Sequence, residues 1–258
     1  ASIWAWIHPP NARMKLTILG TGAAIPTGDR YQSGLLYESA ETTLLVDCGS
    51  GILHRLVQAG CDPTEIDAIL LTHTHLDHVA DLPGIAKVRA MEGVAELRII
   101  APSDTREVLD PWLSIDDIDE RIALVIDEID PGPHGIDDVE FRATRTTHSK
   151  PCHAYRFGDR WGFTGDAEAA PELLEFFDGV DVLVADCAYS DDRPPENHPT
   201  PTALAQAFEE ANTSINRLYL THLYPDAAKR ASETIETVSA ATDASVRVAS
   251  DLDEINLE

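Results

Sequence analysis

The chain has 258 residues, 43% of them hydrophobic and 25% charged, so it is long enough to bury a large core, and its composition excludes disorder. No apolar stretch approaches the ~20 residues of a bilayer-spanning helix, so we expect a soluble, cytoplasmic protein without membrane contact. Its 19 Lys and Arg against 45 Asp and Glu give a net charge of -26, which disfavours binding to nucleic acid. This charge favours a halophilic source, where salt screens self-repulsion, over the alternative of an ordinary acidic mesophile.

Short apolar or alternating runs predict strands along most of the chain. They lie at 15–19, 34–38, 43–47, 68–72, 97–101, 139–147, 153–157, 162–164, 182–186, 218–221 and 245–249. Helical patterns separate them at 51–59, 78–91, 105–112, 171–177, 202–211 and 226–240. This order predicts an α/β layered sandwich, and we expect one domain over 14–258. Residues 1–13 are expected to be a leader left from recombinant expression, a native amphipathic extension being the alternative.

Two further features are local. The longest irregular stretch, 189–200, is long for a connection and is typical of a functional loop. The four cysteines, among them Cys48 and Cys187, show no CxxC spacing. We therefore expect reduced, packed thiols.

The sequence THTHLDH at 72–78 follows the apolar run 68–71 directly. In extended backbone His73 and His75 point the same way, so they can chelate one ion. Asp77 and His78 lie at the turn into the next helix, which suits a second ion nearby. Imidazole and carboxylate ligands suit Zn²⁺, and suit Mn²⁺ or Fe less well. The alternative is a polar turn with satisfied histidines, but so many buried polar groups are costly without a metal.

These residues resemble the metallo-β-lactamase superfamily, whose other motifs follow in order: VDCGSG, THSKP, FTGDA and LTHLYP. The resemblance implies a four-layered αββα sandwich with two metal ions that hold a bridging hydroxide. It implies one site of His73, His75 and His148, another of Asp77, His78 and His222, with Asp166 shared. Asp47 would hold a ligand in orientation from behind.

The opening LGTGAAIPTGDRYQSGLLYES and the run NHPTPTALAQAF are similar to ribonuclease Z and its relatives. This subgroup resemblance implies that His198 assists proton transfer to the leaving group, with Asp77 as the other candidate catalytic residue, and it allows a homodimer. An exposed, inactive His198 is the alternative. Only 18 positions separate His148 from Asp166, so the tRNA-gripping arm of that subgroup is absent. DCAY replaces its His-Glu-Ala-Thr-like motif, and whether Asp186 supplies the acidic partner stays open.

Basic residues concentrate at 141–161, beside His148, with the single acid Asp159 among them. One interpretation is that they steer an anionic substrate to the metals, with Lys150 the best placed. The other is that they are solvent-facing charges of a hairpin.

The sequence thus predicts a metal-dependent hydrolase of a phosphodiester or other small anionic ester. Its metals are expected to be two Zn²⁺, with Mn²⁺ or Fe as the alternatives. The alternatives are a ribonuclease Z-like RNA 3′-end endonuclease, with RNA disfavoured as a partner, and a lactam or lactone hydrolase. A non-enzymatic metal-binding or ligand-sensing protein is a third.

Overall fold

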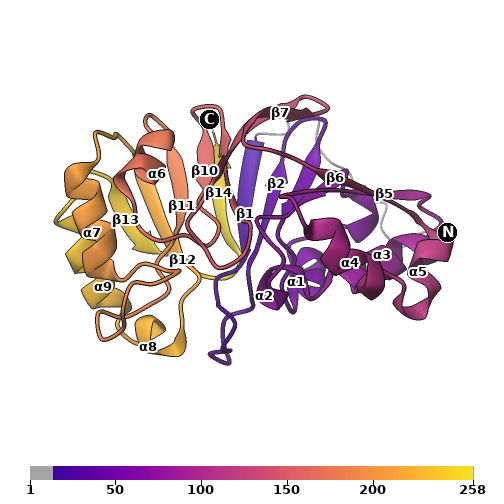
Figure 1. Cartoon of the computed structure of the whole chain (residues 1–258), viewed down its shortest axis with the longest axis horizontal. Coiled ribbons are helices and arrows are strands. Elements are labelled where there is room, and N and C mark those ends of the chain that lie inside the picture. The colour runs from indigo at the N-terminus through magenta and orange to yellow at the C-terminus, as the bar shows by residue number, and fades with distance from the viewer. Residues whose placement is uncertain (1–13, 258) are drawn as a thin grey trace.

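The computed structural model describes residues 14–257, so the predicted leader at 1–13 lies outside the described residues. Two sheets pack face to face, and helices cover the outer face of each (Figure 1). Within residues 14–257, no helix combines the length and the apolar composition needed to cross a membrane.

The first sheet comes from the N-terminal half of the chain and one C-terminal strand. Its order is β14 (Asp253–Leu257), β1 (Met14–Gly20), β2 (Gly34–Glu38), β3 (Thr43–Val46), β4 (Ala68–Leu70), β5 (Glu96–Ala101) and β6 (Ala123–Glu128). Its outer face is covered by α1 (Ile52–Gln58), α2 (Leu76–Val79), α3 (Leu82–Met91), α4 (Thr105–Leu113) and α5 (Ile118–Arg121), with short 3-10 turns at Pro63–Glu65 and Ile115–Asp117.

The second sheet comes from the C-terminal half. Its order is β13 (Ser245–Val248), β12 (Arg217–Thr221), β11 (Val182–Asp186), β10 (Trp161–Phe163), β9 (His153–Phe157), β8 (Val139–Arg145) and β7 (Gly132–Ile136). Helices α6 (Pro171–Phe176), α7 (Pro201–Glu210) and α9 (Ala231–Ser239) cover it, and α8 (Pro225–Ala228) lies at the end of β12.

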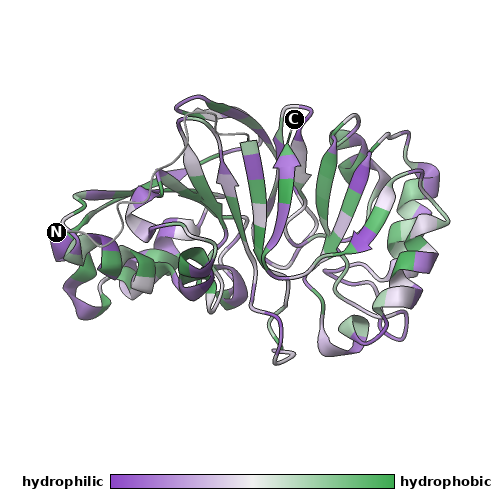
Figure 2. Cartoon of the chain, turned by 180° about the vertical axis from the view of Figure 1, so that it is seen from behind, coloured by the Kyte–Doolittle hydropathy of each residue, from purple (hydrophilic) through white to green (hydrophobic). Residues whose placement is uncertain are grey.

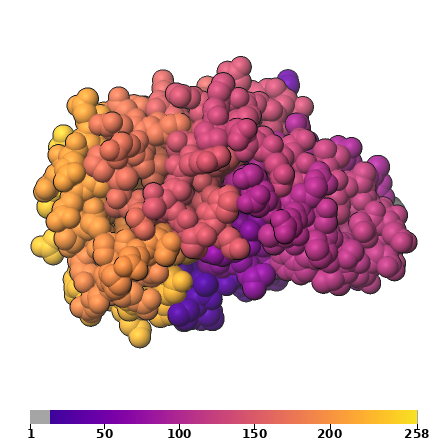
Figure 3. Space-filling view, in the orientation of Figure 1, coloured from indigo at the N-terminus to yellow at the C-terminus, as the bar shows by residue number. Residues whose placement is uncertain are grey.

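Three apolar clusters hold the four layers together. One fills the space between the sheets and includes Tyr155 and Trp161, and one lies between each sheet and its helices. Central strands such as β11 are buried along their whole length, whereas hydrophobic and hydrophilic residues alternate along other strands (Figure 2). The two halves meet along the middle of the molecule in the space-filling view (Figure 3). The αββα sandwich is as predicted.

The differences from the predicted elements have local causes. The predicted helix 78–91 is two helices, because Pro83 lacks an N–H and its ring excludes the continuous helical backbone. The predicted helix 226–240 is likewise divided, into α8 and α9. Three strands, β6, β7 and β14, were not predicted. β7 contains two glycines and a proline, which are unfavourable in strands.

The strand directions determine where functional side chains can meet. β3 and β4 are parallel in the first sheet, and β10, β11 and β12 are parallel in the second. β8 runs in the same direction as β10, because both are antiparallel to β9. The segments that follow these six strands meet at one edge of the sandwich, and they carry the residues described next.

Candidate metal centre

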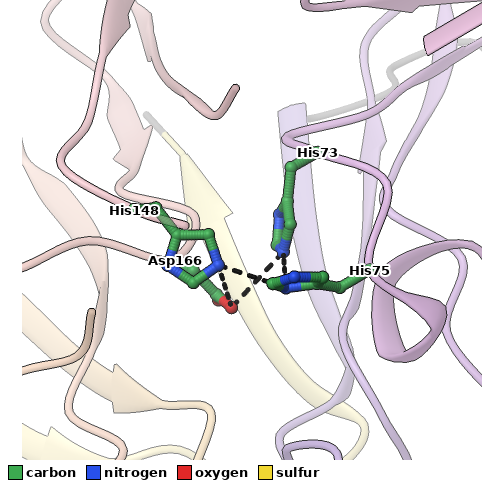
Figure 4. A group of neighbouring side chains, drawn as sticks. All are labelled: His73, His75, His148 and Asp166. Atoms are coloured by element: carbon green, nitrogen blue, oxygen red, sulfur yellow. Dashed lines mark hydrogen bonds and ion pairs between the residues drawn. The ribbon is translucent and has the colours of Figure 1, made fainter. Parts of the chain in front are cut away.

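The segment after β4 supplies the first side chains. His73 is fully buried, and His75 has extended backbone just before α2. Their ring nitrogens His73 Nε2 and His75 Nδ1 lie 2.9 Å apart, so the two imidazoles point to one place, as the alternation predicts. Figure 4 shows them facing His148 and Asp166, which come from the second sheet.

A first group of possible ligands forms around this pair. His148 Nε2 lies 3.1 Å from His75 Nδ1. Asp166 Oδ2 lies 3.5 Å from His73 Nε2 and 3.8 Å from His148 Nε2. One atom of each of the four side chains lies within 4.8 Å of all the others, close enough for them to share one ion.

A second group lies on the other side of Asp166. His222 Nε2 is 3.2 Å from Asp77 Oδ2 and 3.3 Å from His78 Nε2. Asp166 Oδ1 is 3.3 Å from His78 Nε2 and 3.5 Å from His222 Nε2. The two oxygens of Asp166 therefore face different groups, Oδ2 the first and Oδ1 the second.

Two of the ring nitrogens that face away from the centre have partners of their own. His78 Nδ1 is 2.7 Å from Asp47 Oδ2, and His148 Nδ1 is 3.2 Å from the carbonyl oxygen of Asn197. The inward nitrogens instead face one another at 2.9–3.3 Å. Ligands at about 2.0–2.1 Å from a tetrahedral Zn²⁺ are about 3.3–3.4 Å apart, so this crowding fits divalent metal ions. Outer partners of this kind fix the orientation of metal-bound imidazoles.

Backbone conformation brings the Asp47 carboxylate into place. Asp47 is fully buried and has a φ of 59°, in the left-handed region. Two residues later Gly49 approaches the carbonyl oxygen of Asp77 so closely that a Cβ would lie 2.0 Å from it. Only glycine fits there. The loop after β3 is thereby held against the segment that carries the ligands.

Burial and neighbouring charges shift the pKa values of several side chains of the centre. Burial lowers the pKa of His75 and of His148 and, helped by the charge of His78, lowers the pKa of His73 well below its usual value. These three imidazoles are therefore neutral, the form that binds metal. Burial would raise the pKa of Asp77, but the hydrogen bond from His222 and the charge of His78 outweigh it and lower the pKa to about 2.

Asp186 and His198 form a third set beside the other two. His198 Nδ1 lies 2.8 Å from Asp186 Oδ2 and 4.0 Å from Asp166 Oδ2, and its ring stacks on that of His222. Burial opposes the charged form of His198, but the charge and hydrogen bond of Asp186 outweigh it and raise its pKa to about 9. The pairing of Asp186 with His198, which the sequence left open, is present in the structure.

The loop at 189–200 folds around His198. The Tyr189 ring lies 5.1 Å from the His198 ring and 5.4 Å from that of Tyr224. Arg193 lies over both tyrosine rings, 5.1 Å from each centroid, and pairs with Asp226 at 3.1 Å. The rings of Tyr189 and Tyr224 thus lie beside His198, the residue for which the family resemblance implies proton transfer.

Residues 14–242 match the family described as Anti-Pycsar protein Apyc1. The chain belongs to this family. It is 32% identical over 145 residues to a ribonuclease Z from Exiguobacterium sp. (strain ATCC BAA-1283 / AT1b), covering 55% of this chain and 48% of the relative. The chain spans about half the length of the first curated relatives that it matches.

Two solved structures show the same fold. One is the metallo-β-lactamase fold protein YhfI from Bacillus subtilis, with a TM-score of 0.81 and 22% identity over 94% of this chain and 98% of that one. The other is a diphosphatase from the PhnP family, with a TM-score of 0.74 and 20% identity over 95% and 98% of the two chains. The predicted metallo-β-lactamase fold and ribonuclease Z-like membership are confirmed. With the His and Asp clusters, they support the predicted metal-dependent hydrolase.

The basic residues at 141–161 are only in part near this centre. Arg142 and Arg156 are paired in register on β8 and β9. Arg142 lies over the Phe176 ring of α6, and Arg156 donates to the carbonyl oxygen of Phe176, so both fit the interpretation as charges of a hairpin. Lys150 is exposed in the turn directly after His148, and its steering role stays a prediction. All four cysteines of the chain are buried and free.

Proposed function

We propose that this protein hydrolyses a phosphodiester or another small anionic ester with two metal ions, most suitably Zn²⁺ and alternatively Mn²⁺ or Fe. The observation that carries the proposal is the position of Asp166, which turns one oxygen to each ligand group, with the Asp186–His198 pair beside it. A carboxylate shared in this way is suited to a two-metal site.

The ligand roles follow the two groups. His73, His75 and His148 would hold one ion, Asp77, His78 and His222 the other, and Asp166 both. When bound, two such ions lower the pKa of a water molecule and stabilise negative charge on the attacked centre. In this proposal Asp47 keeps His78 oriented, through its contact with the Nδ1 that faces away from the site.

His198 would supply the proton for the leaving oxygen. Its Nδ1 is engaged by Asp186, which leaves Nε2 as the nitrogen that can donate. An imidazolium held next to a carboxylate is typical of general acid catalysis. A phosphodiester with an alkoxide leaving group needs such an acid, because an alkoxide is a poor leaving group without a proton.

Two observations support a small substrate. Residues 149–165, between His148 and Asp166, contain only β9, β10 and their connections, with no room for an extended arm. A protein of the same fold is described as a diphosphatase, which is consistent with a phosphate-containing substrate for this one. The names of the curated relatives favour a second candidate, ribonuclease Z-like cleavage of RNA.

A panel of substrates tests the two candidates. Purified protein is loaded with Zn²⁺ or Mn²⁺ and given bis(p-nitrophenyl) phosphate, a chromogenic lactam and a precursor tRNA. We expect metal-dependent turnover of the phosphodiester to exceed that of the lactam. Cleavage of the tRNA at its 3′ end with a higher kcat/KM than that for the phosphodiester would favour the ribonuclease. Faster turnover of the lactam than of the phosphodiester would favour a lactamase. Full metal loading without any turnover would favour a non-enzymatic role.

The same panel tests the proposed halophilic character. With a net charge of -26, activity and stability should rise between about 0.1 M and about 2 M KCl, because the Debye length falls from about 10 Å to a few ångströms. A fall in both activity and stability as the KCl concentration rises would favour the alternative of an ordinary acidic mesophile protein. Sedimentation velocity at each salt concentration checks the expected homodimer.

A further inference from the structure

Thr72 lies where the two halves of the centre meet, and its backbone is fixed on both sides. The residue follows β4 and is fully buried. Its N–H donates to Asp47 Oδ1 at 2.8 Å, and its carbonyl oxygen accepts from the N–H of His153 at 3.0 Å. The backbone of Thr72 is therefore held by both sheets, and this fixes the position from which its side chain extends.

The hydroxyl group of Thr72 joins His73 of the first ligand group to Asp47, which contacts His78 of the second. Thr72 Oγ1 lies 2.8 Å from Asp47 Oδ2 and 3.1 Å from His73 Nδ1. An ionised carboxylate only accepts hydrogen bonds, so the hydroxyl donates to Asp47 and its lone pairs can accept from His73. That arrangement places the proton of His73 on Nδ1 and leaves the lone pair on Nε2, the atom that faces Asp166.

The methyl group of Thr72 contacts the opposite sheet. Gly165, with a φ of 57°, approaches so closely that a Cβ there would lie 2.9 Å from both Cβ and Cγ2 of Thr72. The next residue is Asp166. Thr72, which directly precedes His73, therefore packs against the segment that carries Asp166, and the size of its side chain sets the separation of the two segments.

We propose that Thr72 is a positioning residue for both ligand groups, through its hydroxyl on His73 and Asp47 and its methyl on Gly165. The inference rests on the proposed two-metal function. Because Asp47 also contacts His78 directly, the loss of the hydroxyl should weaken the first group more than the second. Partners of this kind typically contribute about 10–100-fold to metal affinity.

The test measures metal binding without a substrate, so that it stands apart from any failure to find one. Thr72→Val keeps the shape and removes the hydroxyl, while Thr72→Ser keeps the hydroxyl and removes the methyl. Each is titrated with Zn²⁺ against a chromophoric chelator, and bound metal per chain is counted. We expect Thr72→Val to weaken one of two ions about 10–100-fold. We expect Thr72→Ser to restore most of that affinity.

Thr105→Val is the matched control. Thr105 is also buried, and its hydroxyl makes one hydrogen bond, to the carbonyl oxygen of Pro102, in the outer helical layer. Thr105→Val should lower the urea midpoint of unfolding, because a buried hydrogen bond is lost, and should leave metal affinity unchanged. Equal metal affinities for Thr72→Val and the wild-type protein would overturn the proposal. So would an equal loss in Thr72→Val and Thr105→Val, which would reduce the effect to stability.

If Thr72→Val does not fold, Thr72→Ala, Thr72→Ser and Cys152→Ala decide. Cys152 Sγ lies 3.8 Å from the same His73 Nδ1, but a thiol is only a weak hydrogen-bond partner. Zn²⁺ affinity should therefore change less in Cys152→Ala than in Thr72→Ala, a smaller substitution that also removes the hydroxyl. A Co²⁺ absorption spectrum altered in Thr72→Ser, from the missing methyl, would support the spacing role, and an unchanged spectrum would contradict it.

Discussion

The two halves of the molecule contribute to the centre in different ways. The first sheet places four possible ligands in one short segment, 73–78, held from behind by Asp47 and Thr72. The second sheet brings its side chains from separate loops that follow β8, β10, β11 and β12, and the loop after β11 includes the stretch 189–200. The first half therefore resembles a preformed chelator. The second half adds Asp166, which reaches both groups, and the Asp186–His198 pair, which can move a proton.

Removal of the shared carboxylate should have the largest effect. In Asp166→Ala both ligand groups lose an oxygen, so we expect the protein to bind less than one ion per chain. Metal ions contribute several kcal/mol of transition-state stabilisation, so kcat/KM should fall by about 10³-fold or more. Asp159→Ala, at an exposed turn, is the control. The loss of a single ion with the other at full affinity would mean that Asp166 serves only one group.

Substitution of the proton-transfer pair should separate turnover from metal binding. His198→Ala should retain both ions and lose about 10²–10⁴-fold in kcat on an ester with an alkoxide leaving group. On a p-nitrophenyl ester, whose leaving group needs no proton, the loss should be much smaller. In Asp186→Asn the loss of kcat should depend on the leaving group in the same way, but it should be smaller, because His198 remains. Equal losses of kcat on the two esters would contradict the role of His198 as an acid. Loss of bound metal in His198→Ala would indicate that His198 is a metal ligand.

The same contrast explains what the sequence could predict. His73, His75, Asp77 and His78 are neighbours in the chain, so the period of a strand and the start of a helix suffice to predict their convergence. His148, Asp166 and His222 were found only through a family resemblance, because their proximity depends on the pairing of distant strands. β14 was missed for a similar reason, since its partner β1 lies at the other end of the chain.

The pairing of Asp186 with His198 shows a further limit. The aspartate ends β11 and the histidine lies in an irregular loop, so no periodicity relates them. An acidic residue at the end of a wholly buried strand was the available signal. Thr72 was overlooked for a different reason, because threonine is common at the ends of strands, and its importance depends on three contacts that only the packed structure supplies.

Among these substitutions, one at His153 should have the smallest effect at neutral pH. The backbone N–H of His153 donates to the carbonyl oxygen of Thr72 and so joins the second sheet to the first. The side chain is 3% exposed, and burial, with the charges of Arg145 and His134, lowers its pKa to about 4. In the unfolded chain a histidine has a pKa of about 6.5, so between these values the unfolded state binds more protons. The unfolding free energy should therefore fall as the pH drops from about 6.5 to about 4, by up to about 3 kcal/mol from this residue.

Urea unfolding at high KCl, repeated at several pH values, measures this contribution as the difference between the wild-type protein and His153→Gln. The wild-type protein should lose more stability on acidification than the variant, because glutamine does not titrate. His54→Gln, at an exposed position of α1, should follow the wild-type curve. Parallel curves for the wild-type protein and His153→Gln would mean that His153 binds its proton in the folded state as readily as in the unfolded one. The contact between the two halves at Thr72 would then tolerate a charge, and the acid sensitivity of the fold would have to come from the carboxylates of the centre instead.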